Sequence, residues 1–232
     1  KGHTVTGSDQ NVYPPMSTQL EALGIEIKKG YKPENLNPTP DCVIVGNAIS
    51  RGNLELEEVL NRKLVYRSQA EVVQSEFIRG KHSLVVAGTH GKTTTTTLAS
   101  WMLESGGLNP SFLIGGIAEN FDASFRVTDS DHFVIEGDEY DIAFFDKQPK
   151  FMRYLPEIAI IGNIEFDHAD IYRDEQAVCF AFSRLMNMVP GNGKLIVGID
   201  SPLVQKVLSD MDGKLHTEIE SFGFTDEAMW QI

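Results

Sequence analysis

Several short segments of this chain are apolar at successive positions, and they constrain the fold more than any other feature. The clearest are Cys42–Val45, Ser83–Ala87 and Ile158–Ile161. A strand buried on both faces needs apolar residues at successive positions, whereas a half-exposed strand alternates them with polar ones. Amphipathic segments typical of helices separate these strands, among them Leu54–Asn61 and Glu175–Met188. The pattern predicts an α/β protein with a mostly parallel sheet that is covered by helices.

One of these strands leads directly into a glycine-containing loop. Residues Val86–Thr94 read Val-Ala-Gly-Thr-His-Gly-Lys-Thr-Thr, and a segment typical of a helix follows. A strand, such a loop and a helix N-terminus together form a phosphate site, because backbone N–H groups point at the anion. Lys92 adds positive charge, and Thr93 offers a hydroxyl to Mg²⁺. The general P-loop pattern has a glycine at the position of Val86. We predict that the residues contacting the nucleotide are Gly88, Thr89, His90, Gly91, Lys92, Thr93 and Thr94.

Two later strands end in acidic clusters. The first, Phe133–Asp141, reads Phe-Val-Ile-Glu-Gly-Asp-Glu-Tyr-Asp, and the second, Asn163–Asp170, reads Asn-Ile-Glu-Phe-Asp-His-Ala-Asp. Ligands of open α/β sheets bind at the carboxyl ends of the strands, so both clusters can converge on the bound phosphates. Since Mg²⁺ prefers oxygen ligands, Glu136 is the first metal ligand that we expect. His168 is a candidate ligand of a second metal.

Some of the acidic residues also fit a structural role. An acidic run is typical of a solvated face or a helix N-cap, and Asp138 and Asp141 are compatible with that interpretation. Asp167 and Asp170 are compatible with either a structural or a functional role.

Composition narrows the classes of function. The formal net charge is −13, which argues against a nucleic-acid partner because such proteins carry a basic face. No apolar run approaches the roughly 18 residues of a transmembrane helix, so we expect no membrane partner. Cys42 and Cys179 fit no metal-binding spacing. We expect both to be reduced, buried thiols of a cytoplasmic protein.

Together these motifs resemble those of the Mur ligases, whose central domain carries Gly-Thr-x-Gly-Lys-Thr. The segment beginning at Glu136 resembles the acidic magnesium motif Glu-Ala-Asp-Glu of that family, with Gly137 in place of alanine. Asn163–Asp170 resembles its Asn-x-x-x-Asp-His-x-Asp motif. The resemblance implies catalysis by Lys92, Glu136 and His168, a cofactor contact from Asn163, and metal ligation by Thr93, Glu136 and His168.

The resemblance extends into the N-terminal third and implies two domains. Residues 1–80 correspond to a Rossmann-like UDP-sugar-binding domain without its N-terminal part. Residues 81–232 correspond to a central P-loop ATPase domain without its C-terminal part, and a third domain is absent. We therefore expect the chain to be a piece of a longer enzyme. By their resemblance to family segments and their positions, the substrate contacts are assigned to Ser8, Asp9, Asn47 and Ala48.

The family resemblance also implies a reaction that uses ATP and Mg²⁺. The carboxylate of UDP-N-acetylmuramate would be joined through an acyl phosphate to the amine of the murein tripeptide L-alanyl-γ-D-glutamyl-meso-diaminopimelate, in peptidoglycan recycling. The segments that favour this branch of the family are Tyr13–Thr18, Gly46–Asn53 and Ala143–Lys147. Two alternatives stay open, namely L-alanine as the amine and a nucleotide-binding module without ligase activity. The sequence leaves the oligomeric state open.

Overall fold

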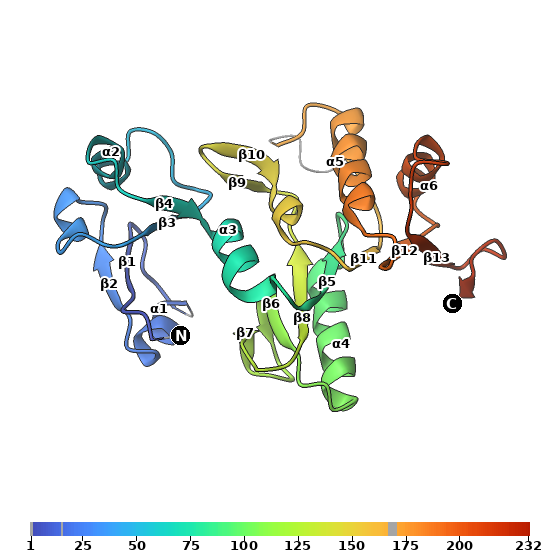
Figure 1. Ribbon diagram of the computed structural model, residues 1–232, viewed down its shortest axis with the longest axis horizontal. Helices are drawn as coiled ribbons and strands as arrows, with labels where there is room; N and C mark the ends of the chain where they lie inside the picture. The colour runs from blue at the N-terminus through green and yellow to red at the C-terminus, as the bar shows by residue number, and fades with distance from the viewer. Residues whose placement is uncertain (1, 15, 167–170) are drawn as a thin grey trace. The chain divides into compact units, whose positions relative to one another are not determined.

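The chain forms two compact units, Lys1–Ser68 and Gln69–Ile232 (Figure 1). The computed structural model describes residues 2–14, 16–166 and 171–232. The division falls before the boundary at residue 80 that the sequence suggested, because α3 (Gln69–Val73) and the π-helix η2 (Gln74–Ile78) contribute side chains to the core of the second unit. Within the described ranges, no helix is long and apolar enough to cross a membrane.

The first unit consists of short parallel strand pairs and short helices. Strand β1 pairs with β2, and β3 pairs with β4. Asn53 caps α2, because its side-chain oxygen accepts hydrogen bonds from the N–H groups of Glu55 and Leu56, each at 3.0 Å. The elements are β1 (Thr6–Asp9), α1 (Met16–Ala22), β2 (Glu26–Lys29), the 3₁₀ helix η1 (Pro33–Leu36), β3 (Val43–Val45), α2 (Leu54–Asn61) and β4 (Tyr66–Ser68).

Two expectations about this unit were wrong. Cys42 is exposed rather than buried, because β3 begins only at Val43 and leaves the cysteine in the preceding connection. Strand β3 was also expected to be buried on both faces. Its Val45 is buried, but Ile44, which points to the opposite face, is 56% exposed. Cys179 in the second unit is buried, as expected.

The second unit is larger and contains the glycine-containing loop. Its main helices alternate with strands along the chain, which is the arrangement that places helices on both faces of a parallel sheet. After α3 and η2, the elements are β5 (His82–Ala87), α4 (Lys92–Ser105), β6 (Ser111–Ala118), β7 (Ala123–Arg126), β8 (His132–Gly137), β9 (Asp141–Ala143), β10 (Asp146–Pro149), the 3₁₀ helix η3 (Lys150–Arg153), β11 (Ile158–Ile161), α5 (Glu175–Met188), β12 (Lys194–Gly198), α6 (Pro202–Asp210), β13 (Glu218–Gly223) and β14 (Trp230–Gln231).

The main sheet has the order β14-β13-β12-β11-β5-β8-β6-β7. Every pair is parallel except β6 with β7. The predicted mostly parallel α/β sheet is therefore confirmed. Strand β5 lies between β8 and β11, so the loop that follows it emerges at the middle of the carboxyl edge of the sheet.

Helices cover both faces of this sheet (Figure 1). Along β8, Phe133 and Ile135 join a large core with residues of α3, η3, α5 and α6. Val134, between them, joins a smaller cluster with Ala99 and Leu103 of α4. Successive side chains of a strand point to opposite faces, so α4 packs on one face and the other helices pack on the opposite face. Double burial explains the apolar residues at successive positions.

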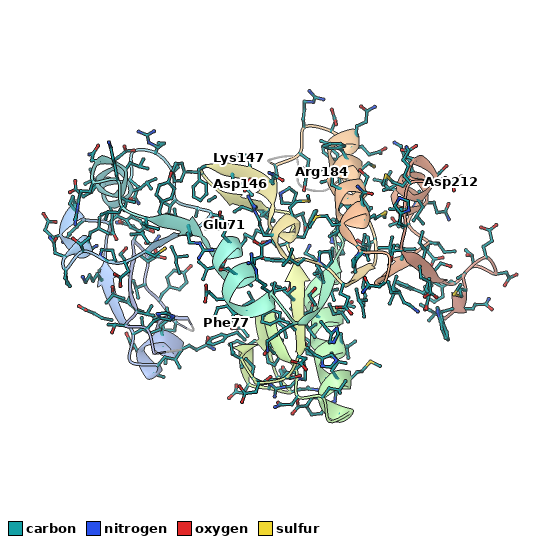
Figure 2. All side chains as sticks on the ribbon, in the orientation of Figure 1. Glu71, Phe77, Asp146, Lys147, Arg184 and Asp212 are labelled. Atoms are coloured by element: carbon teal, nitrogen blue, oxygen red, sulfur yellow. The ribbon has the colours of Figure 1, made fainter. Side chains whose placement is uncertain are left out.

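The hairpin formed by β9 and β10 is anchored to neighbouring helices through polar side chains (Figure 2). The guanidinium of Arg184 on α5 donates to the side-chain oxygen of Gln148 at 2.7 Å. Arg153 of η3 forms an ion pair with Asp146 at 2.6 Å. These contacts hold the segment that follows the acidic cluster against the body of the second unit.

We predict that Gly198→Ala destabilises the second unit. A Cβ at Gly198 would overlap the carbonyl oxygen of Gly162 across the β11–β12 pair, so the backbone would have to shift. We expect the free energy of unfolding, measured by urea denaturation, to fall by about 1–3 kcal/mol. Gly162→Ala is the matched control, since its Cβ meets nothing within 4 Å. Equal stability of the two variants would contradict the prediction.

Candidate functional site

Parallel pairing brings the predicted motifs to one edge of the main sheet. At the end of β5, Val86 pairs with Glu136 and Ala87 pairs with Gly137 of β8. On the other side, Ala87 pairs with Ile161, the last residue of β11. The loop after β5 therefore has the acidic segment on one side and the segment that follows β11 on the other.

The loop owes its shape to two glycines. Gly88 has φ of 135°, and a Cβ there would lie 2.9 Å from the carbonyl oxygen of Asn163. Gly91 has φ of 78° and is the N-cap of α4. Both backbone conformations are rare for residues with a side chain. Because glycine has no side chain to cap the helix, the first N–H groups of α4 find no side-chain acceptor on the cap residue, and a helix N-terminus of this kind is suited to an anion.

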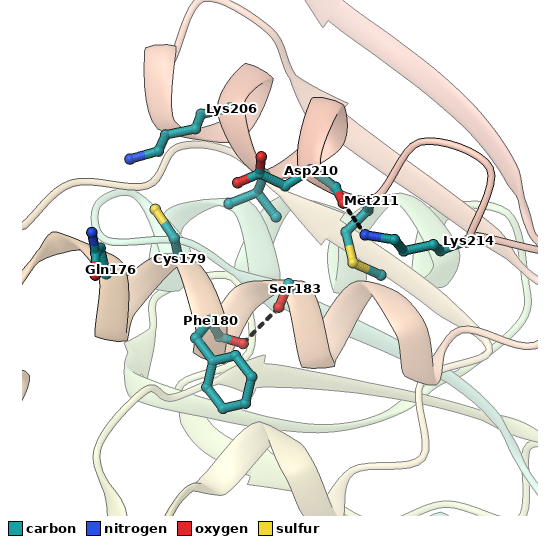
Figure 3. A pocket seen from close by; sticks show the side chains of 9 residues that line it. Gln176, Cys179, Phe180, Ser183, Lys206, Asp210, Met211 and Lys214 are labelled. Atoms are coloured by element: carbon teal, nitrogen blue, oxygen red, sulfur yellow. Dashed lines mark hydrogen bonds between the residues drawn. The ribbon is translucent and has the colours of Figure 1, made fainter.

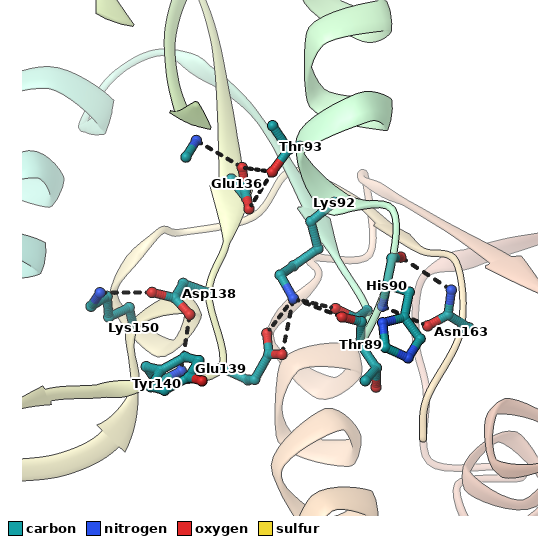
Figure 4. A network of polar contacts seen from close by, with 12 residues as sticks. Thr89, His90, Lys92, Thr93, Glu136, Asp138, Glu139, Tyr140, Lys150 and Asn163 are labelled. Carbon is teal, nitrogen blue, oxygen red and sulfur yellow. Dashed lines mark hydrogen bonds and ion pairs between the residues drawn. The ribbon is translucent and has the colours of Figure 1, made fainter. Parts of the chain in front are cut away.

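Lys92, the first residue of α4, points back into the loop (Figure 4). Its ammonium group donates hydrogen bonds to the carbonyl oxygens of Gly88 at 2.8 Å and Thr89 at 3.1 Å. It also donates to the carboxylate of Glu139 at 2.9 Å. The lysine side chain is 14% exposed and that of Glu139 is 3% exposed. This is a buried ion pair at the centre of the candidate site.

Thr93 faces the other carboxylate of the acidic segment. Its hydroxyl lies 3.0 Å from each carboxylate oxygen of Glu136. The same carboxylate accepts a hydrogen bond from the backbone N–H of Gly115 at 2.8 Å. A Cβ at Gly115 would lie only 2.9 Å from that carboxylate, so glycine allows the close approach. The sequence analysis predicted each of these side chains as a metal ligand, and the structure places them in direct contact.

These oxygen atoms are compatible with Mg²⁺. The ion takes oxygen ligands and is often held by one or two carboxylates together with substrate phosphates and water. The Thr93 hydroxyl and the Glu136 carboxylate provide protein oxygens within the reach of a single ion. No group of three or more His, Cys, Asp or Glu side chains that could hold a metal occurs in the part of the chain that the structure describes. His168 and its neighbours 167, 169 and 170 lie outside the described residues.

Asn163 binds the backbone of the loop. Its side-chain oxygen accepts from the N–H of His90 at 2.9 Å, and its amide group donates to the carbonyl oxygen of the same residue at 3.1 Å. Its own carbonyl oxygen accepts from the N–H of Thr89 at 3.1 Å. The nucleotide contact that the sequence suggested for Asn163 stays a prediction, and the contacts within the protein fix the conformation of the loop.

Glu165 provides a second link to the loop. Its backbone N–H donates to the Thr89 hydroxyl at 2.8 Å, and that hydroxyl lies 3.2 Å from the carbonyl oxygen of Glu165. The carboxylate lies 3.5 Å from the ring nitrogen Nε2 of His90. The residues after β11 therefore hold the predicted phosphate loop from one side.

The remaining carboxylates of the acidic segment have basic partners. Asp138 lies 2.7 Å from the ammonium of Lys150, and Asp141 lies 2.9 Å from that of Lys147.

Burial, reinforced by neighbouring carboxylates, raises the pKa of the Tyr172 hydroxyl above its usual range. The hydroxyl donates to the backbone oxygen of Glu139 at 3.0 Å.

The sequence analysis did not select Glu139, although the buried ion pair with Lys92 depends on it. The residue stands at the fourth position of the motif that begins at Glu136. Its place in that motif is the sequence feature that could have identified it as a site residue. Acidic residues in a run are more often solvated, so the sequence alone did not single out this one as buried.

The predicted substrate contacts lie in the first unit. The hydroxyl of Ser8 donates to the carboxylate of Glu55 at 2.9 Å. Asp9, the last residue of β1, accepts from the N–H of Asn11 at 3.0 Å. Asn47 and Ala48 form an exposed turn after β3. Ser8 and Asp9 therefore lie at the carboxyl end of β1, and Asn47 and Ala48 follow the carboxyl end of β3.

The second unit also contains a pocket of about 400 Å³ between α5 and α6 (Figure 3). Cys179, Phe180 and Lys206 are among its lining residues, and none of the predicted site residues is. Burial raises the pKa of the Cys179 thiol, which lowers its reactivity as a nucleophile. The predicted site residues therefore lie at the loop after β5 and do not line this pocket.

Comparison with known proteins gives the family. The model of the Mur ligase middle domain matches residues 86–232, and that of the Mur ligase family catalytic domain matches residues 1–81. The chain belongs to the Mur ligase family. The resemblance seen in the loop and the acidic motifs is confirmed.

Two curated relatives show how similar this chain is to two kinds of ligase. The UDP-N-acetylmuramate–L-alanyl-γ-D-glutamyl-meso-2,6-diaminoheptandioate ligase of Escherichia coli K12 is 52% identical over 195 residues, which are 84% of this chain and 43% of that protein. The UDP-N-acetylmuramate–L-alanine ligase of Salinibacter ruber is 35% identical over 229 residues, 98% of this chain and 45% of that protein. The chain thus spans less than half the length of these relatives.

A solved structure agrees with the family assignment. The UDP-N-acetylmuramate:L-alanyl-γ-D-glutamyl-meso-diaminopimelate ligase from Neisseria meningitides matches with a TM-score of 0.91 and 41% identity. The match covers 97% of this Mur ligase chain and 71% of the Neisseria chain.

We predict that Asn163 controls the mobility of the loop. Asn163→Ala removes both side-chain hydrogen bonds to His90, so the His90 N–H should exchange with deuterium faster in the ligand-free protein. Asn163→Asp keeps an acceptor for that N–H and should exchange at an intermediate rate. Hydrogen exchange followed by NMR measures both rates. Unchanged exchange at His90 in the alanine variant would contradict the assigned role.

Proposed function

We propose that this chain is part of an ATP-dependent ligase that forms a C–N bond in peptidoglycan recycling. The reaction joins the lactyl carboxylate of UDP-N-acetylmuramate to the amine of L-alanyl-γ-D-glutamyl-meso-diaminopimelate. The observation that carries the nucleotide part of this proposal is the loop after β5, which presents Lys92 at a helix N-terminus beside two carboxylates. The family membership supports the ligase chemistry.

The nucleotide site is proposed at residues 88–94. Backbone N–H groups of Gly91 and of the first turn of α4 would bind the β- and γ-phosphates, because those of Thr89 and His90 donate to Asn163. Lys92 would neutralise negative charge on the γ-phosphate. This arrangement fits phosphoryl transfer, in which the protein mainly positions the reactants and stabilises charge. Asn163 supports the site by holding the backbone of His90.

Thr93 and Glu136 would hold Mg²⁺, which supplies charge neutralisation at the phosphates when it is bound. The contact between the two side chains, with 3.0 Å between their oxygens, supports this assignment. A second metal at His168 rests on the family resemblance of residues Asn163–Asp170.

The chemistry proceeds in two steps. In the first, a carboxylate oxygen of the substrate attacks the γ-phosphorus, an acyl phosphate forms and ADP leaves. In the second, the amine attacks the acyl carbon and loses a proton, and inorganic phosphate leaves as the amide forms. Neither step requires a covalent nucleophile from the protein. Charge stabilisation by Lys92 and by the loop N–H groups is the main contribution that we assign to this chain.

The tripeptide is favoured over L-alanine as the amine. This preference rests on the higher identity to the E. coli ligase, 52% against 35% for the L-alanine ligase of S. ruber. None of the site residues proposed for this chain is assigned to the amine, so both amines are tested as substrates.

The two-domain assignment is also a proposal. It places UDP-sugar binding in residues 1–80 and ATP binding in residues 81–232. The family models support it, since they meet between residues 81 and 86. Within the first domain, the proposed substrate contacts are Ser8, Asp9, Asn47 and Ala48.

We predict that phosphate release depends on the tripeptide. The complete protein that carries this chain is incubated with ATP, Mg²⁺ and UDP-N-acetylmuramate, and then with tripeptide or L-alanine. Phosphate is expected only with the tripeptide. Release that requires L-alanine would assign the protein to the UDP-N-acetylmuramate–L-alanine ligases. No release with either amine would favour a nucleotide-binding module without ligase activity.

We also predict that Lys92→Ala lowers kcat/KM by about 100-fold or more, because it removes a preorganised charge at the phosphates. Lys206→Ala is the matched control, since this exposed lysine pairs with Glu175 away from the loop. Steady-state phosphate release measures both variants. Full activity of Lys92→Ala would refute the nucleotide site.

A further inference from the structure

Glu139 occupies an unusual position for a carboxylate in a polar site. Its side chain is 3% exposed, and both of its oxygens lie 2.9 Å from the ammonium of Lys92 (Figure 4). Its backbone oxygen accepts a hydrogen bond from Tyr172. A buried carboxylate is stable in its charged form only when a cation or several donors compensate it. Lys92 supplies a cation beside both oxygens.

The ammonium of Lys92 has an acceptor for each of its donors. It has three N–H donors, and it meets the carbonyl oxygens of Gly88 and Thr89 and the carboxylate of Glu139. A phosphate that takes up Lys92 must replace at least one of these acceptors. Replacing the Glu139 contact would leave a buried negative charge close to an arriving negative phosphate. Both effects oppose the binding of a nucleotide without a cation.

The neighbouring carboxylates do not share this constraint. Asp138 is paired with Lys150, and Glu136 contacts Thr93 and the N–H of Gly115. Neither contacts the ammonium of Lys92. A change at Asp138 therefore alters the charge of the same segment without releasing the lysine.

We propose that Glu139 is a positioning residue that retains Lys92 inside the loop and thereby makes nucleotide binding depend on Mg²⁺. This inference rests on the proposed function, in which Lys92 binds the phosphates of ATP. Without a cation, Glu139 competes with the phosphates for Lys92 and repels them. With Mg²⁺ present, the added positive charge offsets the carboxylate, and Lys92 is released at lower cost.

The test is the affinity for ATP with Mg²⁺ and with EDTA, measured by isothermal titration calorimetry on the complete protein. Glu139→Gln keeps the size of the side chain and removes its charge. We expect this variant to bind ATP about tenfold more tightly in EDTA, a typical size for coupling between sites. We expect a smaller change with Mg²⁺, so the ratio of the two affinities should fall.

Two variants separate the possible failures. Asp138→Asn is the matched control and should keep the ratio of the unaltered protein. Lys92→Ala should weaken ATP binding in both conditions. If Lys92→Ala binds ATP normally, the proposed nucleotide site is wrong. If Lys92→Ala binds weakly while Glu139→Gln keeps the original ratio, the role of Glu139 is wrong and the nucleotide site stands.

A second measurement needs no nucleotide. Lys92→Met in the original background removes the Lys92 cation from beside the buried Glu139 carboxylate, whereas in a Glu139→Gln background no charged carboxylate stands there. The fall in Tm on introducing Lys92→Met should therefore be larger in the original background. Equal falls would show that the two side chains are not coupled, and would overturn the inference even if one variant were too unstable for calorimetry.

Discussion

The parallel pairing of β5 with β8 on one side and β11 on the other is the constraint on which the site depends. Because all three strands run in the same direction, their carboxyl ends meet at one edge of the sheet. The loop after β5 is thereby placed between an acidic segment and an asparagine-containing segment. Helices on both faces of the sheet fix this register, since a shift of one residue would exchange the buried side chains of the two cores.

Charge at this edge is arranged in local pairs. The chain carries a formal net charge of −13, yet the proposed ligand of the candidate site is a phosphate group. Backbone N–H groups and Lys92 supply the positive potential, and nearby carboxylates balance it or offer oxygens to a cation. The overall charge therefore says little about the ligand, because short-range contacts in a partly buried site outweigh distant, screened surface charges.

Sequence patterns predicted the main sheet well and the smaller unit less well. In the second unit, helices bury both faces of each central strand, so apolar residues occur at successive positions and the pattern is unambiguous. In the first unit, β3 carries the same pattern, yet Ile44 is exposed while Val45 is buried. A run of apolar residues allows a strand to be buried on both faces. Only tertiary packing decides whether both faces are buried.

For the candidate site, the sequence by itself determined the chemical groups and their order along the chain. The glycines that shape the loop, Lys92, Thr93 and Glu136 were all identifiable, because a phosphate loop needs those residue types at that spacing. Tertiary structure decided their partners. Glu139 pairs with Lys92, and Asn163 holds the backbone of His90. Both contacts join residues more than 40 positions apart in the chain, so they exist only because parallel strands bring distant segments to the same edge.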